Sequence, residues 1–226
     1  MDNIQYLSQF NLLQSLTIED LIEMDEMTSI TVIPKKTFIQ TPESFSEGLY
    51  FVKKGKVRLY KLSEEGKQFT SDILGEGNVF GVMNIISFGT RDHYIETIEE
   101  SHICLMSKDR FENFLMQRPR FMMNLLQVLS DRISAMSRLT QNLALGGLHD
   151  KILHILMKLS NQFGLTSMDR DEYCKIDFPL SHQEIANLVG ATREAVTVAL
   201  QELSEQKRIK TGFKTIYIHK KMLLQN

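Results

Sequence analysis

The sequence predicts an α+β fold in three parts: an N-terminal β-roll, a long helix and a C-terminal winged helix-turn-helix. Three observations predict it. Short apolar runs broken by glycine fill residues 31–106, an apolar heptad pattern follows, and two short amphipathic segments joined at a glycine lie near the C-terminus. The predicted domain limits are 1–110 for the β-roll, 111–145 for the long helix and 146–226 for the helix-turn-helix domain.

The composition is that of a folded, water-soluble protein. The chain has 226 residues, 42% of them hydrophobic, and a formal net charge of -2, which is enough chain for two domains. It has no basic start followed by an apolar run, and no apolar stretch long enough to span a bilayer. We therefore expect a cytoplasmic protein with no membrane partner.

The side chains that usually carry catalysis or bind metals are not grouped in this sequence. Cys104 and Cys174 lie far apart, so cysteine ligands alone cannot build a zinc site or an iron-sulfur cluster within one chain. We find no nucleophile with an evident base, no phosphate loop of the GxxxxGK type and no histidine pair at metal-binding spacing. The sequence therefore predicts no catalytic site and no metal site, and a protein that is not an enzyme.

The N-terminal half is predicted to change from helix to sheet. Residues 1 to about 30 are predicted to be helical, with Thr17 as an N-cap and an acidic outer face. From residue 31 to about 106, runs such as LYFVKKG and KVRLYKLS alternate with glycine turns at even spacing. This spacing favours a compact antiparallel barrel or roll over a parallel sheet, and such a roll can enclose one small ligand.

Apolar residues recur every seven positions in the long helix predicted from about residue 108. One seam contains Leu115, Met122, Leu129, Met136 and Leu143, and a second contains Leu126, Ile133 and Thr140. A seam of this length is typical of a dimerisation helix. The predicted dimer interface comprises Met122, Leu126, Leu129, Ile133, Met136, Thr140 and Leu143. The alternative is a helix packed only on its own domain, through further apolar residues at Phe114, Phe121, Leu125 and Leu139.

A hinge and a small helical domain are predicted after the heptads. Gly146 and Gly147 offer a place to bend, and residues 149–163 form an amphipathic helix. Residues 164–173 are read as a polar loop and residues 175–180 as a short strand.

The segment 180–203, LSHQEIANLVGATREAVTVALQEL, predicts two helices joined by a tight turn. Ser181 and Glu184 have the spacing of a capping box, Gly190 suits the left-handed conformation of the corner, and Thr192 suits an N-cap of the second helix. Arg193 begins the second helix and faces outward with its polar neighbours, as in helices that read DNA. The alternative is a helical pair that only packs.

The stretch RIKTGFKTIYIHK predicts a β-hairpin that turns at 211–214 and forms a wing beside the helical pair. Basic residues gather after Leu203, where Glu205 is the one acid. They are Lys207, Arg208, Lys210, Lys214, Lys220 and Lys221. Such a cluster is typical of phosphate binding. The predicted DNA contacts are Ser181, His182, Thr192, Arg193, Glu194, Thr197, Val198 and Lys214.

The order of these parts resembles the Crp/Fnr superfamily of bacterial transcription regulators. The resemblance covers almost the whole chain and depends on LYFVKKGKVRLYKLSEEGK, GEGNVFG and SHQEIANLVGATREAVTVALQEL. It implies a roll of the cyclic-nucleotide-binding type, a homodimer and double-stranded DNA as partner. It also implies that Arg193 recognises guanine and that Glu194 accepts from cytosine. Val198 stands where the family has a further base-contacting arginine, so we expect readout at that base pair to be weaker or to switch to contact with a thymine methyl.

The candidate effector pocket departs from the family pattern. The family's cyclic-nucleotide signature has glutamate after the glycine that matches Gly81, and an Arg-Ser pair about ten residues later. Here Val82 stands at the first position, and Asp92 and His93 stand at the other two. An acid near the phosphate position would repel cyclic AMP, so binding in the usual mode is not expected. The candidate pocket residues are Gly81, Val82, Met83, Asp92 and His93.

Two other effector sites of the family, an iron-sulfur cluster and a haem, depend on a few cysteine and histidine residues. The N-terminal cysteine cluster of the oxygen-sensing branch is missing, so no iron-sulfur cluster is expected. His93, His102 and Cys104 lie where haem-sensing relatives have ligands, but a lone histidine is more often a surface or hydrogen-bonded residue, so haem is not expected either. An unidentified small molecule near Val82 and Met83 and activity without any ligand remain open.

The sequence therefore predicts a homodimeric, sequence-specific DNA-binding regulator. The family implies RNA polymerase as a further partner and favours an activator over a repressor. A ligand-sensing module whose C-terminal domain binds protein is the alternative. The salt dependence of binding distinguishes these two functions, because DNA binding weakens steeply as the salt concentration rises.

Overall fold

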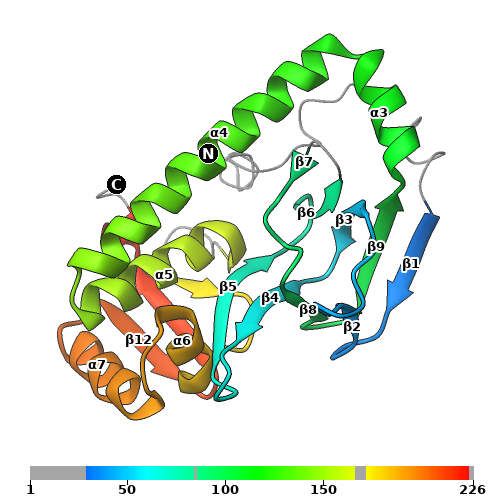
Figure 1. The fold of residues 1–226 in the computed structure, drawn as a ribbon. Coiled ribbons are helices and arrows are strands. Elements are labelled where there is room, and N and C mark those ends of the chain that lie inside the picture. The colour runs from blue at the N-terminus through cyan, green and yellow to red at the C-terminus, as the bar shows by residue number, and fades with distance from the viewer. Residues whose placement is uncertain (1–28, 84–85, 166–171, 224–226) are drawn as a thin grey trace. The chain divides into compact units, whose positions relative to one another are not determined.

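The computed structural model describes residues 29–83, 86–165 and 172–223, and it confirms the predicted α+β class (Figure 1). The described chain forms two compact units, the first ending at Ser134 and the second beginning at Ala135. The helix predicted near the N-terminus lies outside the described residues. The three predicted domain ranges remain predictions.

The first unit contains a roll of two antiparallel sheets. Their strands are β1 (Ser29–Ile33), β2 (Phe38–Gln40), β3 (Gly48–Lys54), β4 (Val57–Leu62), β5 (Gln68–Leu74), β6 (Val79–Met83), β7 (Ile86–Ser87), β8 (Tyr94–Thr97) and β9 (Ser101–Met106). One sheet has the order β1-β9-β3-β6-β7 and the other β2-β8-β4-β5. The predicted roll is thus confirmed.

Strand β3 explains why one run of the sequence is apolar at successive positions. Tyr50 and Val52 pack in the core that includes residues of both sheets, whereas Leu49 and Phe51 pack in a second core with the helices that follow. A strand buried on both faces reads as a continuous apolar run, not as an alternating one. The LYFV segment therefore marks the centre of the first unit.

Two helices follow the roll, where the sequence predicted one. Helix α3 (Lys108–Met116) ends before Pro119, and α4 (Pro119–Leu145) begins at that proline. Proline disfavours a helical residue before it but suits the first position of a new helix. Leu115 lies in α3 and packs in the second core, so its place in the predicted seam was wrong. The rest of the predicted seam, from Met122 onward, remains a prediction.

The described part of the second unit contains the end of α4, several further helices and a small sheet. Helix α5 (Leu148–Phe163) follows the predicted hinge, with Gly147 at its N-cap. The remaining helices are α6 (His182–Val189), α7 (Arg193–Glu205) and the short α8 (Lys220–Leu223). The strands β10 (Gly164–Leu165), β11 (Tyr173–Ile176), β12 (Ile209–Gly212) and β13 (Thr215–His219) form a sheet in the order β10-β11-β13-β12.

The start of this sheet differs from the predicted loop and strand. The sequence predicts a loop at Gly164 and Leu165, but these residues pair with Ile176 and Lys175 of β11. The strand predicted at 175–180 lies at Tyr173–Ile176 instead. A two-residue strand has no alternating pattern of its own, so this pairing was not visible in the sequence.

Candidate nucleic-acid interface

The first helix of the pair begins and ends as its local chemistry predicts. The Ser181 hydroxyl accepts a hydrogen bond from the Glu184 N–H (3.2 Å), and the Glu184 carboxylate accepts one from the Ser181 N–H (2.7 Å). This is a complete capping box. Gly190 ends the helix at a φ of 68°, the left-handed region that glycine adopts without strain. The corner between α6 and α7 is therefore set by these residues.

Helix α7 presents one buried and one exposed face. The Thr192 hydroxyl accepts from the Ala195 N–H (3.2 Å) and caps the helix. The buried residues are Val196, Ala199, Leu200 and Leu203. The predicted contacts Arg193, Glu194, Thr197 and Val198 are exposed, and Val198 is 57% exposed. Because residues spaced by four share a helix face, they form one stripe along α7.

The wing is anchored beside this stripe. The Leu180 N–H donates to the Lys214 carbonyl (2.9 Å), which ties the wing turn to the residue before the capping box. Strands β12 and β13 pair from Ile209 to Gly212 and leave Phe213 and Lys214 as the turn. Lys214 has a φ of 52°, so the second residue of the turn adopts the left-handed conformation. The predicted hairpin is thus confirmed.

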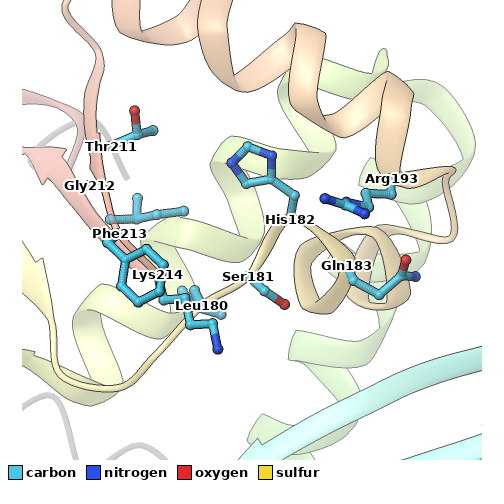
Figure 2. Close-up of a pocket in the computed structure, with 10 residues that line it drawn as sticks. Leu180, Ser181, His182, Gln183, Arg193, Thr211, Gly212, Phe213 and Lys214 are labelled. Carbon is cyan, nitrogen blue, oxygen red and sulfur yellow. The ribbon is translucent and has the colours of Figure 1, made fainter.

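A cleft lies between the start of α6, the start of α7 and the wing (Figure 2). It has a volume of about 490 Å³. Its lining residues are Leu180, Ser181, His182, Gln183, Arg193, Thr211, Gly212, Phe213, Lys214 and Ile216. None of these ten carries a carboxylate, whereas Arg193 and Lys214 are cationic. The cleft thus brings together four of the predicted DNA contacts, Ser181, His182, Arg193 and Lys214. Its positive charge favours a negatively charged partner.

Three functional candidates in this unit were missed in the sequence. Gln183 and Phe213 line the cleft, and Phe213 could have been noticed as an aromatic residue within a polar GFK turn. His149 of α5 lies 2.6 Å from the Glu202 carboxylate of α7, measured from Nε2 to Oε2. This pair links α5 to the C-terminal end of α7. No short-range pattern signals it, because 53 residues separate the two.

The candidate effector residues lie around the end of β6. Gly81 has a φ of 116°, and its N–H donates to the Thr90 hydroxyl (3.0 Å). A β-carbon at Gly81 would lie 2.2 Å from the Gly48 carbonyl oxygen, so the two strands approach closely only because a glycine stands there. Val82 is half-buried, and the side chain of Met83 lies outside the described ones.

The segment before β8 is braced by a residue that the sequence did not suggest. The Gln40 amide Nε2 lies 2.8 Å from the carbonyl oxygen of Thr90 and 3.3 Å from those of Arg91 and His93. Asp92 is exposed, whereas His93 is buried. The Arg91 guanidinium carbon lies 5.5 Å from the centre of the Phe45 ring. The acid at position 92 thus faces solvent beside a cation that contacts an aromatic ring.

The predicted dimer residues differ in exposure. Leu126 is 55% and Ile133 69% exposed, and Met122 is also exposed, whereas Leu129 packs against the core of the first unit. The side chains of Met136, Thr140 and Leu143 lie outside the described ones. Apolar side chains exposed along one helix are typical of a protein interface.

Within residues 29–83, 86–165 and 172–223, no three histidine, cysteine, aspartate or glutamate side chains are grouped so that they could hold a metal ion. Within the same residues, no helix combines the length and the hydropathy needed to cross a bilayer.

Known proteins resemble this chain over most of its length. Residues 30–118 match the profile of the cyclic nucleotide-binding domain, and residues 150–226 match that of the Crp-like helix-turn-helix domain. The chain is 32% identical over 185 residues to the global nitrogen regulator of a Nostoc species, which covers 81% of this chain and 82% of that protein. It is 27% identical over 179 residues to the CRP-like cAMP-activated global transcriptional regulator of Mycobacterium tuberculosis, with 77% and 79% covered. A solved CooA mutant from Carboxydothermus hydrogenoformans has the same fold, with a TM-score of 0.72 and 23% identity over 88% of each chain.

Proposed function

The chain belongs to the Crp/Fnr family of transcription regulators with a helix-turn-helix DNA-binding domain, and we propose that it binds a near-palindromic DNA site as a homodimer. The observation that carries this proposal is the exposed stripe of α7 beside a cleft whose described lining residues carry no carboxylate. Two such helices, related by the dimer axis, would enter successive major grooves.

Three side chains of the stripe have DNA partners that their chemistry favours. The Arg193 guanidinium can donate two hydrogen bonds to guanine, and the Glu194 carboxylate can accept from a cytosine amino group. Val198 offers an apolar contact to a thymine methyl. Ser181, His182, Thr192 and Lys214 lie around the cleft and the helix starts, where contacts to phosphate fix the register on the duplex.

The dimer would form along α4. Leu126 and Ile133 expose apolar surface in the single chain, and burial against a second copy would remove that surface from water. The alternative, in which α4 packs only on its own unit, accounts for Leu129 and Leu125, which contact the roll core. It leaves Leu126 and Ile133 uncovered.

The proposed ligand of the roll is independent of the proposed DNA contacts. The Mycobacterium tuberculosis relative is described as cAMP-activated. We propose that this chain does not bind cyclic AMP in the usual mode, because Asp92 and His93 stand where the family places its arginine and serine. An unidentified small molecule beside Gly81, Val82 and Met83, or activity without a ligand, is proposed instead. We further propose that the protein is a cytoplasmic activator that contacts RNA polymerase, as family members do.

The test is a selection of DNA sites from a random duplex library by the full-length protein, with and without extract of its own cells. We expect an enriched inverted repeat with half-sites one helical turn apart. We also expect the affinity for the selected site to fall steeply with rising salt. If no repeat is enriched in either condition, or if binding is insensitive to salt, the C-terminal domain binds protein and the proposal is wrong.

A further inference from the structure

Phe213 is the most exposed large apolar side chain among those described, at 92%. It lies at the tip of the wing turn, between Gly212 and Lys214. The turn geometry does not need an aromatic ring there, since the residue at positive φ is Lys214. Because the ring is exposed in the folded chain as it is in the unfolded one, it adds little to the stability of the fold and offers apolar surface that a partner can bury. The position of this ring therefore points to contact with another molecule.

The surroundings of Phe213 limit which molecule it contacts. The ring lines the same cleft as Arg193 and His182, across from the start of α7 (Figure 2). None of the described lining residues is acidic, and the Lys214 ammonium lies 5.7 Å from the centre of the Phe213 ring. A cationic cleft continuous with the exposed face of α7 fits a polyanion better than an apolar protein surface.

We propose that Phe213 packs against the deoxyribose of the DNA strand that lies in this cleft, next to the phosphate held by Lys214. The inference rests on the proposed DNA-binding function and adds an apolar contact to the ionic one. Adjacent α-carbons are about 3.8 Å apart, so neighbouring side chains at a turn can meet a sugar and its adjoining phosphate. Sugar contacts carry no base information directly, so Phe213 raises affinity without setting sequence preference.

A single tryptophan tests this contact directly. The chain contains no tryptophan, so Phe213→Trp in the full-length protein gives one fluorescent reporter at the wing tip. On addition of the selected duplex, we expect its emission to shift to shorter wavelength and its quenching by acrylamide to fall. Leu165→Trp is the matched control. Leu165 is 48% exposed and lies in β10, at the opposite edge of the same sheet, so its emission should not respond to DNA.

Affinity measurements complete the test. Phe213→Ala should weaken binding by about tenfold, since part of a phenyl ring is no longer buried. The slope of affinity against salt should stay unchanged. Phe213→Leu should recover part of the loss, and neither variant should change the melting temperature, because the side chain is exposed in the free protein. A tryptophan that stays accessible on DNA, or becomes protected only on adding RNA polymerase, would overturn the inference and leave DNA binding intact. Failure of the wild-type protein to bind any duplex would overturn both.

Discussion

Nδ1 of His182 lies 2.8 Å from Oγ1 of Thr197, which joins the start of α6 to the exposed face of α7. The Thr197 hydroxyl donates to the Arg193 carbonyl (2.8 Å). Because a hydroxyl has one proton, it must accept from His182, and this places a proton on Nδ1. Nε2 is then the ring nitrogen available for the proposed contact with DNA. The link holds the side chain of one proposed DNA contact relative to another.

Thr197→Val keeps the shape of the side chain but removes the hydroxyl. We expect specific DNA binding to weaken by about three- to tenfold, the value of one hydrogen bond. Thr197→Ser keeps the hydroxyl and should bind nearly as the wild type does. Fluorescence anisotropy with labelled duplex measures both variants.

A double-mutant cycle with His182→Ala separates the link from direct contacts of Thr197 with DNA. If the two residues act together, the combined loss is smaller than the sum of the single losses. Strictly additive losses would show that the link does not contribute to binding.

Arg193→Ala and Lys214→Ala should weaken binding in different ways. Arg193→Ala should cost about 1 to 3 kcal/mol at the specific site and relax the preference at one base pair, because a base contact is lost. Lys214→Ala should weaken binding to all sequences and reduce the salt slope by about one per subunit. Competition with base-substituted duplexes at several salt concentrations distinguishes them. An unchanged preference at every base pair after Arg193→Ala would contradict the assigned role.

The parts of the interface that depend on local chemistry could be predicted from the sequence. Ser181 and Glu184 are three residues apart, and Thr192 is three residues from the N–H that it caps, so their hydrogen bonds follow from spacing alone. Gly190 follows from the need for a left-handed residue at the corner. The roll could be predicted as a class because its turns and apolar runs recur at even spacing.

The parts that depend on long-range packing could not be predicted. The Gln40 side chain contacts the Thr90 carbonyl across 50 residues, and His182 reaches Thr197 through a side chain whose rotamer the sequence does not specify. The predicted heptad seam includes Leu115 because the seven-residue spacing alone does not show that the helix is interrupted before Pro119. The cleft required the wing, α6 and α7 to be placed together.

Ile133→Glu should reduce the dimer fraction. The side chain is 69% exposed in the single chain, so a charge there leaves the fold intact but becomes costly when a partner covers it. Ser134→Glu adds the same charge at the next residue, also exposed and outside the seam, and should keep the dimer. Analytical ultracentrifugation over a dilution series measures both variants. If both variants dimerise equally well, α4 is not the interface at this position.

Tyr60→Phe should protect the roll at alkaline pH. Burial, reinforced by the Glu96 carboxylate, raises the pKa of Tyr60 above its ordinary value of 10.0. In the unfolded chain the phenol loses its proton near the ordinary value, whereas the folded protein keeps it to higher pH. The stability linked to this proton is therefore fully present below the unfolded pKa and is lost as pH rises through the folded pKa. Urea unfolding from about pH 8 to about pH 11 should show the wild type losing stability relative to Tyr60→Phe, which has no proton to lose. Parallel curves for the two proteins over this range would show that Tyr60 does not titrate with a raised pKa.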